Sequence, residues 1–235
     1  MNVITRNIPN AITCLNLAGG VMAILCASRG ADTLWCGLSA FMWAFIFIGI
    51  AAVADFLDGF AARLLHAYSE LGKELDSLCD MVSFGVAPAV IMHYSLAAAG
   101  APEWTTWAVL LIPVCGALRL ARFNIDTRQT TSFIGLPIPA NALFWVGYSS
   151  LCLQGAEFMA EWYVVLAALL AVSLLMVSPM RLFSLKFKTW GWRGNRLRWL
   201  LIITAPVLLF CMGISGLMWL VIAYVLYGLF DRGEE

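Results

Sequence analysis

Four aspartates in the segment ADFLDGFAARLLHAYSELGKELDSLCD have the residue type and the spacing of a metal centre. Asp55 and Asp58 are three residues apart, and Asp76 and Asp80 are four apart, so each pair shares one face of a helix. Four carboxylates gathered in a region of low dielectric repel one another unless cations neutralise them. Oxygen-only ligands favour hard ions such as Mg²⁺ or Mn²⁺ over zinc. If the two helices pack as a hairpin, the segment predicts a divalent-metal site.

Small and basic residues accompany the carboxylates. Gly59 and Ala62 continue the face of the first pair, and Gly72 lies one turn before the second pair. Their small size leaves room for a ligand against the backbone, although small residues in membrane helices also serve plain helix packing. Arg63 is a candidate phosphate clamp, and the alternative is an anchor at a helix end.

The composition indicates which kind of element must position these residues. The chain is 62% hydrophobic and 12% charged, which is typical of a polytopic membrane protein and excludes an ordinary soluble domain. We expect an all-α transmembrane helical bundle of about eight spans, with six or seven as the alternative. The predicted spans are about 11–29, 34–62, 71–98, 104–123, 136–154, 161–180, 198–213 and 215–231. Gly213 and Gly216 predict a tight hairpin between the last two.

The basic residues orient this bundle. With the N-terminus inside, every Lys and Arg except Arg29 falls in a cytoplasmic segment, which favours an even number of spans. Both termini and the aspartate cluster are then expected on the cytoplasmic side, in an integral protein of a bacterial inner membrane. The basic loop 181–198, with Trp190 and Trp192, is expected to lie against anionic headgroups.

Two classes of function fit intramembrane carboxylates. One is a cation-coupled transporter, which usually places such groups near the membrane midplane, on broken helices or in repeated halves. The other is a metal-dependent phosphoryl-transfer enzyme. Here the cluster lies at one end of the bundle, in a single hairpin, and this position favours the enzyme.

The same residues resemble a known family. The pattern Asp55-x₂-Asp58-Gly59-x₂-Ala62-Arg63-x₈-Gly72-x₃-Asp76-x₃-Asp80 is similar at every position to the signature of the CDP-alcohol phosphatidyltransferases. The segment Ile8-Pro9-Asn10-x₂-Thr13-x₂-Asn16 resembles the start of that family's first helix. Segments 83–89, 119–124 and 135–140 resemble the phosphatidylserine synthase branch of the family.

The resemblance implies one integral-membrane domain over residues 1–235, with a six-helix core at about 8–180 and a C-terminal hairpin at about 198–231. It implies transfer of the phosphatidyl group from CDP-diacylglycerol to the hydroxyl of L-serine, with release of CMP. Asp55, Asp58 and Asp76 would hold two divalent cations, Mg²⁺ or Mn²⁺, and Asp80 would bind one of them and accept the proton. The residues expected to contact CDP-diacylglycerol are Gly59, Ala62, Arg63, Ser69, Gly72, Asn10 and Thr13.

The acceptor alcohol is harder to predict. Arg119 and Arg122 share a helix face, Asn124 follows, and together they are candidates for binding the serine carboxylate. The alternative is that both arginines are membrane anchors. Glycerol 3-phosphate, inositol phosphate and choline stay open as acceptors. We expect no nucleic-acid partner, and the resemblance suggests a homodimer. Asn10, Thr13 and Asn16 either cap the first helix or face the nucleotide.

Overall fold

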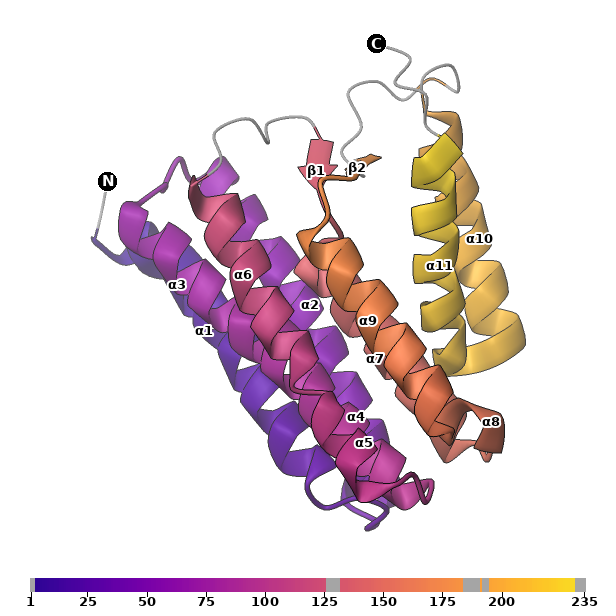
Figure 1. The fold of residues 1–235 in the computed structure, drawn as a ribbon. Helices are drawn as coiled ribbons and strands as arrows, with labels where there is room; N and C mark the ends of the chain where they lie inside the picture. Colours follow the sequence, from indigo (N-terminus) through magenta and orange to yellow (C-terminus); the bar gives the residue numbers. More distant parts are fainter. Residues whose placement is uncertain (1–2, 126–131, 184–190, 192–194, 231–235) are drawn as a thin grey trace.

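The computed structural model describes residues 3–125, 132–183, 191 and 195–230. These residues form a bundle of helices with one pair of very short strands (Figure 1). The bundle begins with α1 (Val3–Ala27), the short η1 turn (Trp35–Gly37) and α2 (Ala40–Leu64). A continuous rod follows, made of α3 (Glu70–Asp80), the π-helical turn η2 (Met81–Val86) and α4 (Ala87–Ala98).

The second half of the chain adds the remaining helices. They are α5 (Glu103–Ala108), α6 (Leu111–Ile125), α7 (Ile138–Leu153), α8 (Glu157–Ala160), α9 (Trp162–Val177), α10 (Arg196–Met212) and α11 (Gly216–Phe230), with η3 (Gly213–Ser215) between the last two. Strand β1 (Ser132–Ile134) pairs antiparallel with β2 (Arg181–Phe183), which ties the start of α7 to the end of α9. Figure 1 shows α10 and α11 side by side at one flank of the bundle, where α11 packs against α7.

Five helical stretches of the described residues are long and apolar enough to cross a membrane. They are Asn7–Ala27, Ala40–Leu64, Glu70–Ala98, Glu103–Ile125 and Arg196–Leu229, and α7 and α9 are shorter apolar helices. The last stretch reverses direction at Gly213, whose φ of 60° is the left-handed conformation that glycine adopts without strain. The protein is therefore a helical integral membrane protein, and α10 and α11 pack against each other on either side of this turn.

The structure differs from the predicted spans in detail. The first helix begins at Val3, and its apolar stretch is Asn7–Ala27 where about 11–29 was predicted. The span predicted at 104–123 is confirmed as Glu103–Ile125, and within it the helix is interrupted between Ala108 and Leu111. The paired strands were not predicted at all. Most of the basic loop 181–198, including Trp190 and Trp192, lies outside the described residues, so its membrane contact stays a prediction.

Helix α1 is the support on which the aspartate-bearing segments are assembled. It packs along α2 and also contacts α3, η2 and α4. Helices α2 and α3 share few close backbone contacts with each other, so packing of both on α1 replaces the direct α2–α3 hairpin packing expected from the sequence. The connection between α2 and α3 is short. It ends at Ser69, which caps the start of α3: the Ser69 hydroxyl accepts a hydrogen bond from the Gly72 amide at 3.0 Å.

The π-helical turn is held in place from two sides. On one side, the Asn141 side chain of α7 donates to the Phe84 carbonyl at 3.3 Å and accepts from the indole nitrogen of the fully buried Trp145 at 2.8 Å. On the other side, Gly20 of α1 lies directly against Ser83. Because η2 follows Asp80 immediately, these contacts also fix where the last aspartate lies.

Adding a methyl group at Gly20 is expected to destabilise the protein. A Cβ there would lie 2.7 Å from the Ser83 Cα, a backbone atom that cannot move without displacing η2. We expect Gly20→Ala to lower the free energy of unfolding by about 1–3 kcal/mol, as overpacking does. Thermal unfolding in detergent measures the change. The matched control is Gly49→Ala on α2, where a Cβ meets nothing within 4 Å; an equal Tm for both variants would contradict the prediction.

Candidate active site

Three of the four predicted metal ligands meet in space. One carboxylate oxygen from each of Asp55, Asp76 and Asp80 lies within 4.8 Å of the other two. Asp55 comes from the last three turns of α2, and Asp76 and Asp80 come from the second half of α3. The shared-face argument from the sequence therefore predicts this cluster. Asp58 is buried one turn further along α2 and lines the cleft beside the cluster together with Asp76.

Two of the four carboxylates each have one oxygen without a hydrogen-bond partner. Oδ2 of Asp58 and Oδ1 of Asp76 are buried and form no hydrogen bond. Among the described residues, the one ion pair within 4.0 Å joins Arg29 and Asp32, and it involves none of the four. Buried, unpaired carboxylate oxygens are unfavourable unless a cation or a proton compensates them. The donor set, which is all oxygen, fits hard divalent cations.

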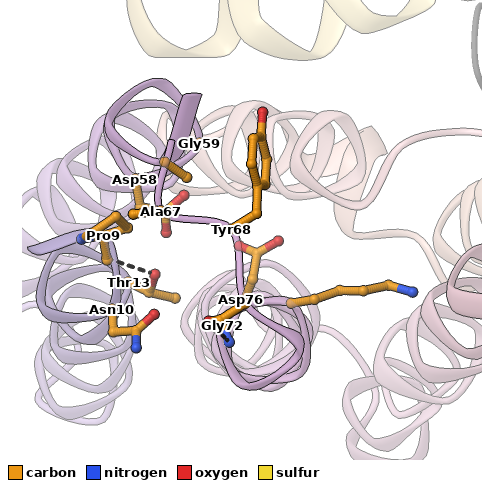
Figure 2. Close-up of a pocket in the computed structure, with 12 residues that line it drawn as sticks. Pro9, Asn10, Thr13, Asp58, Gly59, Ala67, Tyr68, Gly72 and Asp76 are labelled. Atoms are coloured by element: carbon orange, nitrogen blue, oxygen red, sulfur yellow. Dashed lines mark hydrogen bonds between the residues drawn. The ribbon is translucent and has the colours of Figure 1, made fainter. Parts of the chain in front are cut away.

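A cleft of 230 Å³ opens between α1, α2 and α3 beside the cluster (Figure 2). Six of the seven residues predicted to contact CDP-diacylglycerol line it: Asn10, Thr13, Gly59, Ala62, Ser69 and Gly72. The seventh, Arg63, is exposed at the end of α2 and is not part of the lining. The phosphate-clamp role of Arg63 therefore stays a prediction from the resemblance.

The two glycines of the signature differ in their surroundings. A Cβ on Gly59 would meet nothing within 4 Å, so this position leaves open space in the wall of the cleft. A Cβ on Gly72 would lie 3.0 Å from both Asn10 Oδ1 and Ser69 Oγ. Gly72 thus serves the close packing of α1 on the capped start of α3, whereas Gly59 is the one that leaves room for a ligand.

Four further residues line the cleft that were not predicted to contact CDP-diacylglycerol, namely Pro9, Ala67, Tyr68 and Lys73. Tyr68 is 71% exposed and stands at the edge of the cleft (Figure 2). Ala67 and Tyr68 belong to the connection between α2 and α3, where helical spacing carries no information. Pro9 and Lys73 could have been found, because each is next to a residue that was predicted.

The three predicted acceptor residues have different environments. Arg119 of α6 is buried and close enough to Asp80 for electrostatic attraction, and its Cζ lies 5.0 Å from the ring centre of Phe123. Arg122 is exposed and donates to the Val177 carbonyl at 2.9 Å. Of the two arginines, Arg119 is therefore the better placed for acceptor binding.

Asn124 joins the end of α6 to α3. Its side-chain amide donates to Ser77 Oγ at 3.0 Å, and Lys73 Nζ donates to its backbone carbonyl at 3.3 Å. Ser77 directly follows Asp76, so Asn124 lies close to the cluster. These contacts already engage the Asn124 amide within the protein, and acceptor binding by Asn124 stays a prediction.

Comparison with known proteins supports the resemblance. The CDP-alcohol phosphatidyltransferase family matches residues 6–177, which contain every predicted site residue. The CDP-diacylglycerol–serine O-phosphatidyltransferase of Mycobacterium leprae is 36% identical over 184 residues, which are 74% of this chain and 58% of that protein. The chain therefore spans less than two thirds of the length of that relative.

For two other relatives with the same name, the matched region is a larger share of the relative's length. The Bacillus subtilis protein is 39% identical over 137 residues, which are 58% of this chain and 71% of that protein. The Helicobacter pylori protein is 31% identical over 228 residues, which are 94% of this chain and 89% of that protein. With the signature aspartates clustered beside a cleft and the family match over most of its length, this chain belongs to the CDP-alcohol phosphatidyltransferase family.

Proposed function

We propose that this protein is a CDP-diacylglycerol–serine O-phosphatidyltransferase that needs divalent cations. The observation that carries the proposal is the meeting of Asp55, Asp76 and Asp80 beside a cleft lined by the signature glycines. The serine hydroxyl oxygen attacks the phosphorus that bears the diacylglycerol. The bond from that phosphorus to the bridging oxygen breaks, CMP leaves with the bridging oxygen, and the hydroxyl proton goes to Asp80. Phosphatidylserine is the second product.

The chain supplies positioning and proton transfer to this reaction. Asp55, Asp58 and Asp76 would hold two cations, with Asp80 a ligand of one of them, and bound cations supply charge neutralisation at the two phosphates. Gly59 leaves space for the nucleotide end of the donor, and Thr13 and Asn10 form the α1 side of the cleft. Asp80 is one of the three clustered carboxylates, and in this proposal it is the base that takes the hydroxyl proton. Positioning and electrostatics of this kind account for most catalysis in phosphoryl transfer.

Serine is the proposed acceptor because of the relatives. Those from M. leprae, B. subtilis and H. pylori carry serine in their names. So does an archaetidylserine synthase of Methanothermobacter thermautotrophicus, which is 35% identical over 181 residues. The buried Arg119 guanidinium near Asp80 suits the carboxylate of serine. The alternatives with the same chemistry are glycerol 3-phosphate, inositol phosphate and choline.

The membrane arrangement is part of the proposal. We infer eight crossings in one domain over residues 1–235, with α7 and α9 as short spans and α10 and α11 as separate ones. Helices of 15 to 17 residues are about 22–26 Å long, a little less than the hydrocarbon core. The excess of basic residues on one side supports cytoplasmic termini and a cytoplasmic active site in a bacterial inner membrane. A homodimer is proposed from the resemblance alone.

An acceptor panel tests the proposed function. Purified protein in mixed micelles with CDP-diacylglycerol and Mn²⁺ is expected to release CMP and form phosphatidylserine when L-serine is present. Glycerol 3-phosphate, inositol phosphate and choline should give little product, because the relatives are named for serine and because choline offers Arg119 no carboxylate. Thin-layer chromatography of labelled lipid identifies the headgroup.

The same panel distinguishes the alternatives. A different lipid headgroup would keep the reaction type and replace serine as the acceptor. A transporter would move its substrate into sealed vesicles and make no lipid product. Omitting Mn²⁺, the alcohol or the CDP-lipid in turn provides the controls, and each omission should stop CMP release.

A further inference from the structure

Asn16 of α1 connects to the proposed base directly. It is fully buried, and its side-chain nitrogen donates a hydrogen bond to Asp80 Oδ1 at 3.0 Å. The two residues are 64 positions apart in the sequence, so the contact exists only because α1 packs on α3 and η2. The cleft lining does not include Asn16.

The orientation of the Asn16 amide follows from its partner. A carboxylate accepts hydrogen bonds and donates none, so the amide must turn its NH₂ group toward Asp80. Its oxygen, Oδ1, is then left buried without any hydrogen-bond partner. An unpaired buried amide oxygen costs stability. A fold that keeps such an arrangement beside its reacting groups points to function, because local rules are broken chiefly at functional sites.

The Asn16 backbone is fixed as firmly as its side chain. Its carbonyl accepts a hydrogen bond from Ser83 Oγ at 2.9 Å, and one helical turn further along α1 Gly20 lies against the same serine. The amide is therefore presented to Asp80 from a rigid backbone. Before cations bind, repulsion from Asp55 and Asp76, whose oxygens lie within 4.8 Å, would otherwise favour rotation of the Asp80 side chain away from the cluster.

We propose that Asn16 is a positioning residue that holds the Asp80 carboxylate in the orientation from which it accepts the proton of the acceptor alcohol. One hydrogen bond to Oδ1 occupies a single lone pair, and a carboxylate has about four such sites. The others stay available to a cation and to the hydroxyl. Asn16 itself touches no substrate in this scheme, and it acts through Asp80. The inference rests on the proposed function, because it needs Asp80 to be the base.

Removing the amide tests the inference. In Asn16→Ala we expect kcat for CMP release to fall about 10- to 100-fold, as for losses of groups that orient a ligand or a base. The KM values for CDP-diacylglycerol and for the alcohol, and the Mn²⁺ affinity, should change by no more than about twofold, because none of these ligands contacts Asn16. Single-turnover kinetics and Mn²⁺ binding by electron paramagnetic resonance measure these quantities.

Two further variants separate positioning from packing. Asn16→Asp keeps the size of the side chain, and its ionised carboxylate cannot donate to Asp80, so at a pH where it is ionised it should lose as much kcat as Asn16→Ala even if the alanine variant folds poorly. Ser95→Ala removes a different buried hydrogen bond, from Ser95 Oγ to the Ile91 carbonyl at 2.7 Å, on α4 and away from the aspartate cluster. It should lower the Tm while kcat stays within about twofold of wild type.

Three results would overturn the inference: wild-type kcat in Asn16→Asp, a loss in KM or Mn²⁺ affinity rather than in kcat, or an equal kcat loss in Ser95→Ala. The assay uses whichever alcohol supports turnover by the wild type. If serine is not the acceptor, the wild-type protein will show it by using another alcohol. If Asn16 does not position Asp80, only the comparison of variants with the wild type will show it.

Discussion

Replacing Asp80 with asparagine is expected to lower kcat for CMP release by about 100- to 10,000-fold, which is the usual contribution of a positioned general base. Asparagine has nearly the same shape as aspartate and can still receive the hydrogen bond from Asn16 through its side-chain oxygen. It cannot accept the proton of the alcohol. Because Asp55, Asp58 and Asp76 are unchanged, Mn²⁺ binding should be largely retained. Single-turnover CMP release and Mn²⁺ titration, made on the same preparation, check the two halves of this expectation.

The matched control is Asp32→Asn. Asp32 follows α1 and forms an exposed ion pair with Arg29 at 3.1 Å. Such surface pairs contribute about 0–1 kcal/mol to stability, so this variant should have wild-type kcat and nearly wild-type Tm. Near-normal turnover by Asp80→Asn would show that another group takes the proton. A complete loss of Mn²⁺ binding by Asp80→Asn would instead show that its main role is as a ligand.

The helical segments could be predicted because apolar runs have the length that a membrane requires. The break between α5 and α6 could also have been found, because Pro113 cannot donate a hydrogen bond to the Val109 carbonyl. The strands could not. Ser132–Ile134 pairs with Arg181–Phe183, and two three-residue strands so far apart in the chain leave no periodic signal.

In the site too, contacts within one helix could be predicted from the sequence, and contacts between distant helices could not. Helical spacing placed Asp55 with Asp58 and Asp76 with Asp80, and the structure brings three of these carboxylates together. Spacing alone also put Arg119 and Arg122 on one face, yet Arg119 is buried near Asp80 while Arg122 bonds to a carbonyl of α9. The two arginines differ because α6 packs against other helices at Arg119 and not in the same way at Arg122. The residue spacing within α6 cannot predict that packing. Asn16 could be noticed as a polar residue in an apolar helix, but its partner could not be named.

Removing the cations, or one of their ligands, should have the second large effect. Chelation of the wild-type protein is expected to abolish CMP release, and added Mn²⁺ or Mg²⁺ should restore it, because charge at the two phosphates is then neutralised. In Asp76→Asn we expect the Mn²⁺ dissociation constant to rise and turnover to fall at least about 100-fold at a fixed ion concentration. Excess Mn²⁺ should recover part of that turnover. Mn²⁺ titrations followed by electron paramagnetic resonance and by CMP release check both effects.

The Asp76→Asn and Asp80→Asn variants should be compared directly, because each changes one carboxylate of the same cluster. Excess Mn²⁺ restores a weakened ion site but does not replace a missing base, so recovery should be seen for Asp76→Asn and not for Asp80→Asn. Glu74→Gln is the matched control: it lies on the same helix, two residues before Asp76, and is exposed. Its Mn²⁺ affinity and turnover should equal those of the wild type. If Asp76→Asn bound Mn²⁺ as tightly as Glu74→Gln, the unpaired oxygens of the cluster would need another explanation than bound cations.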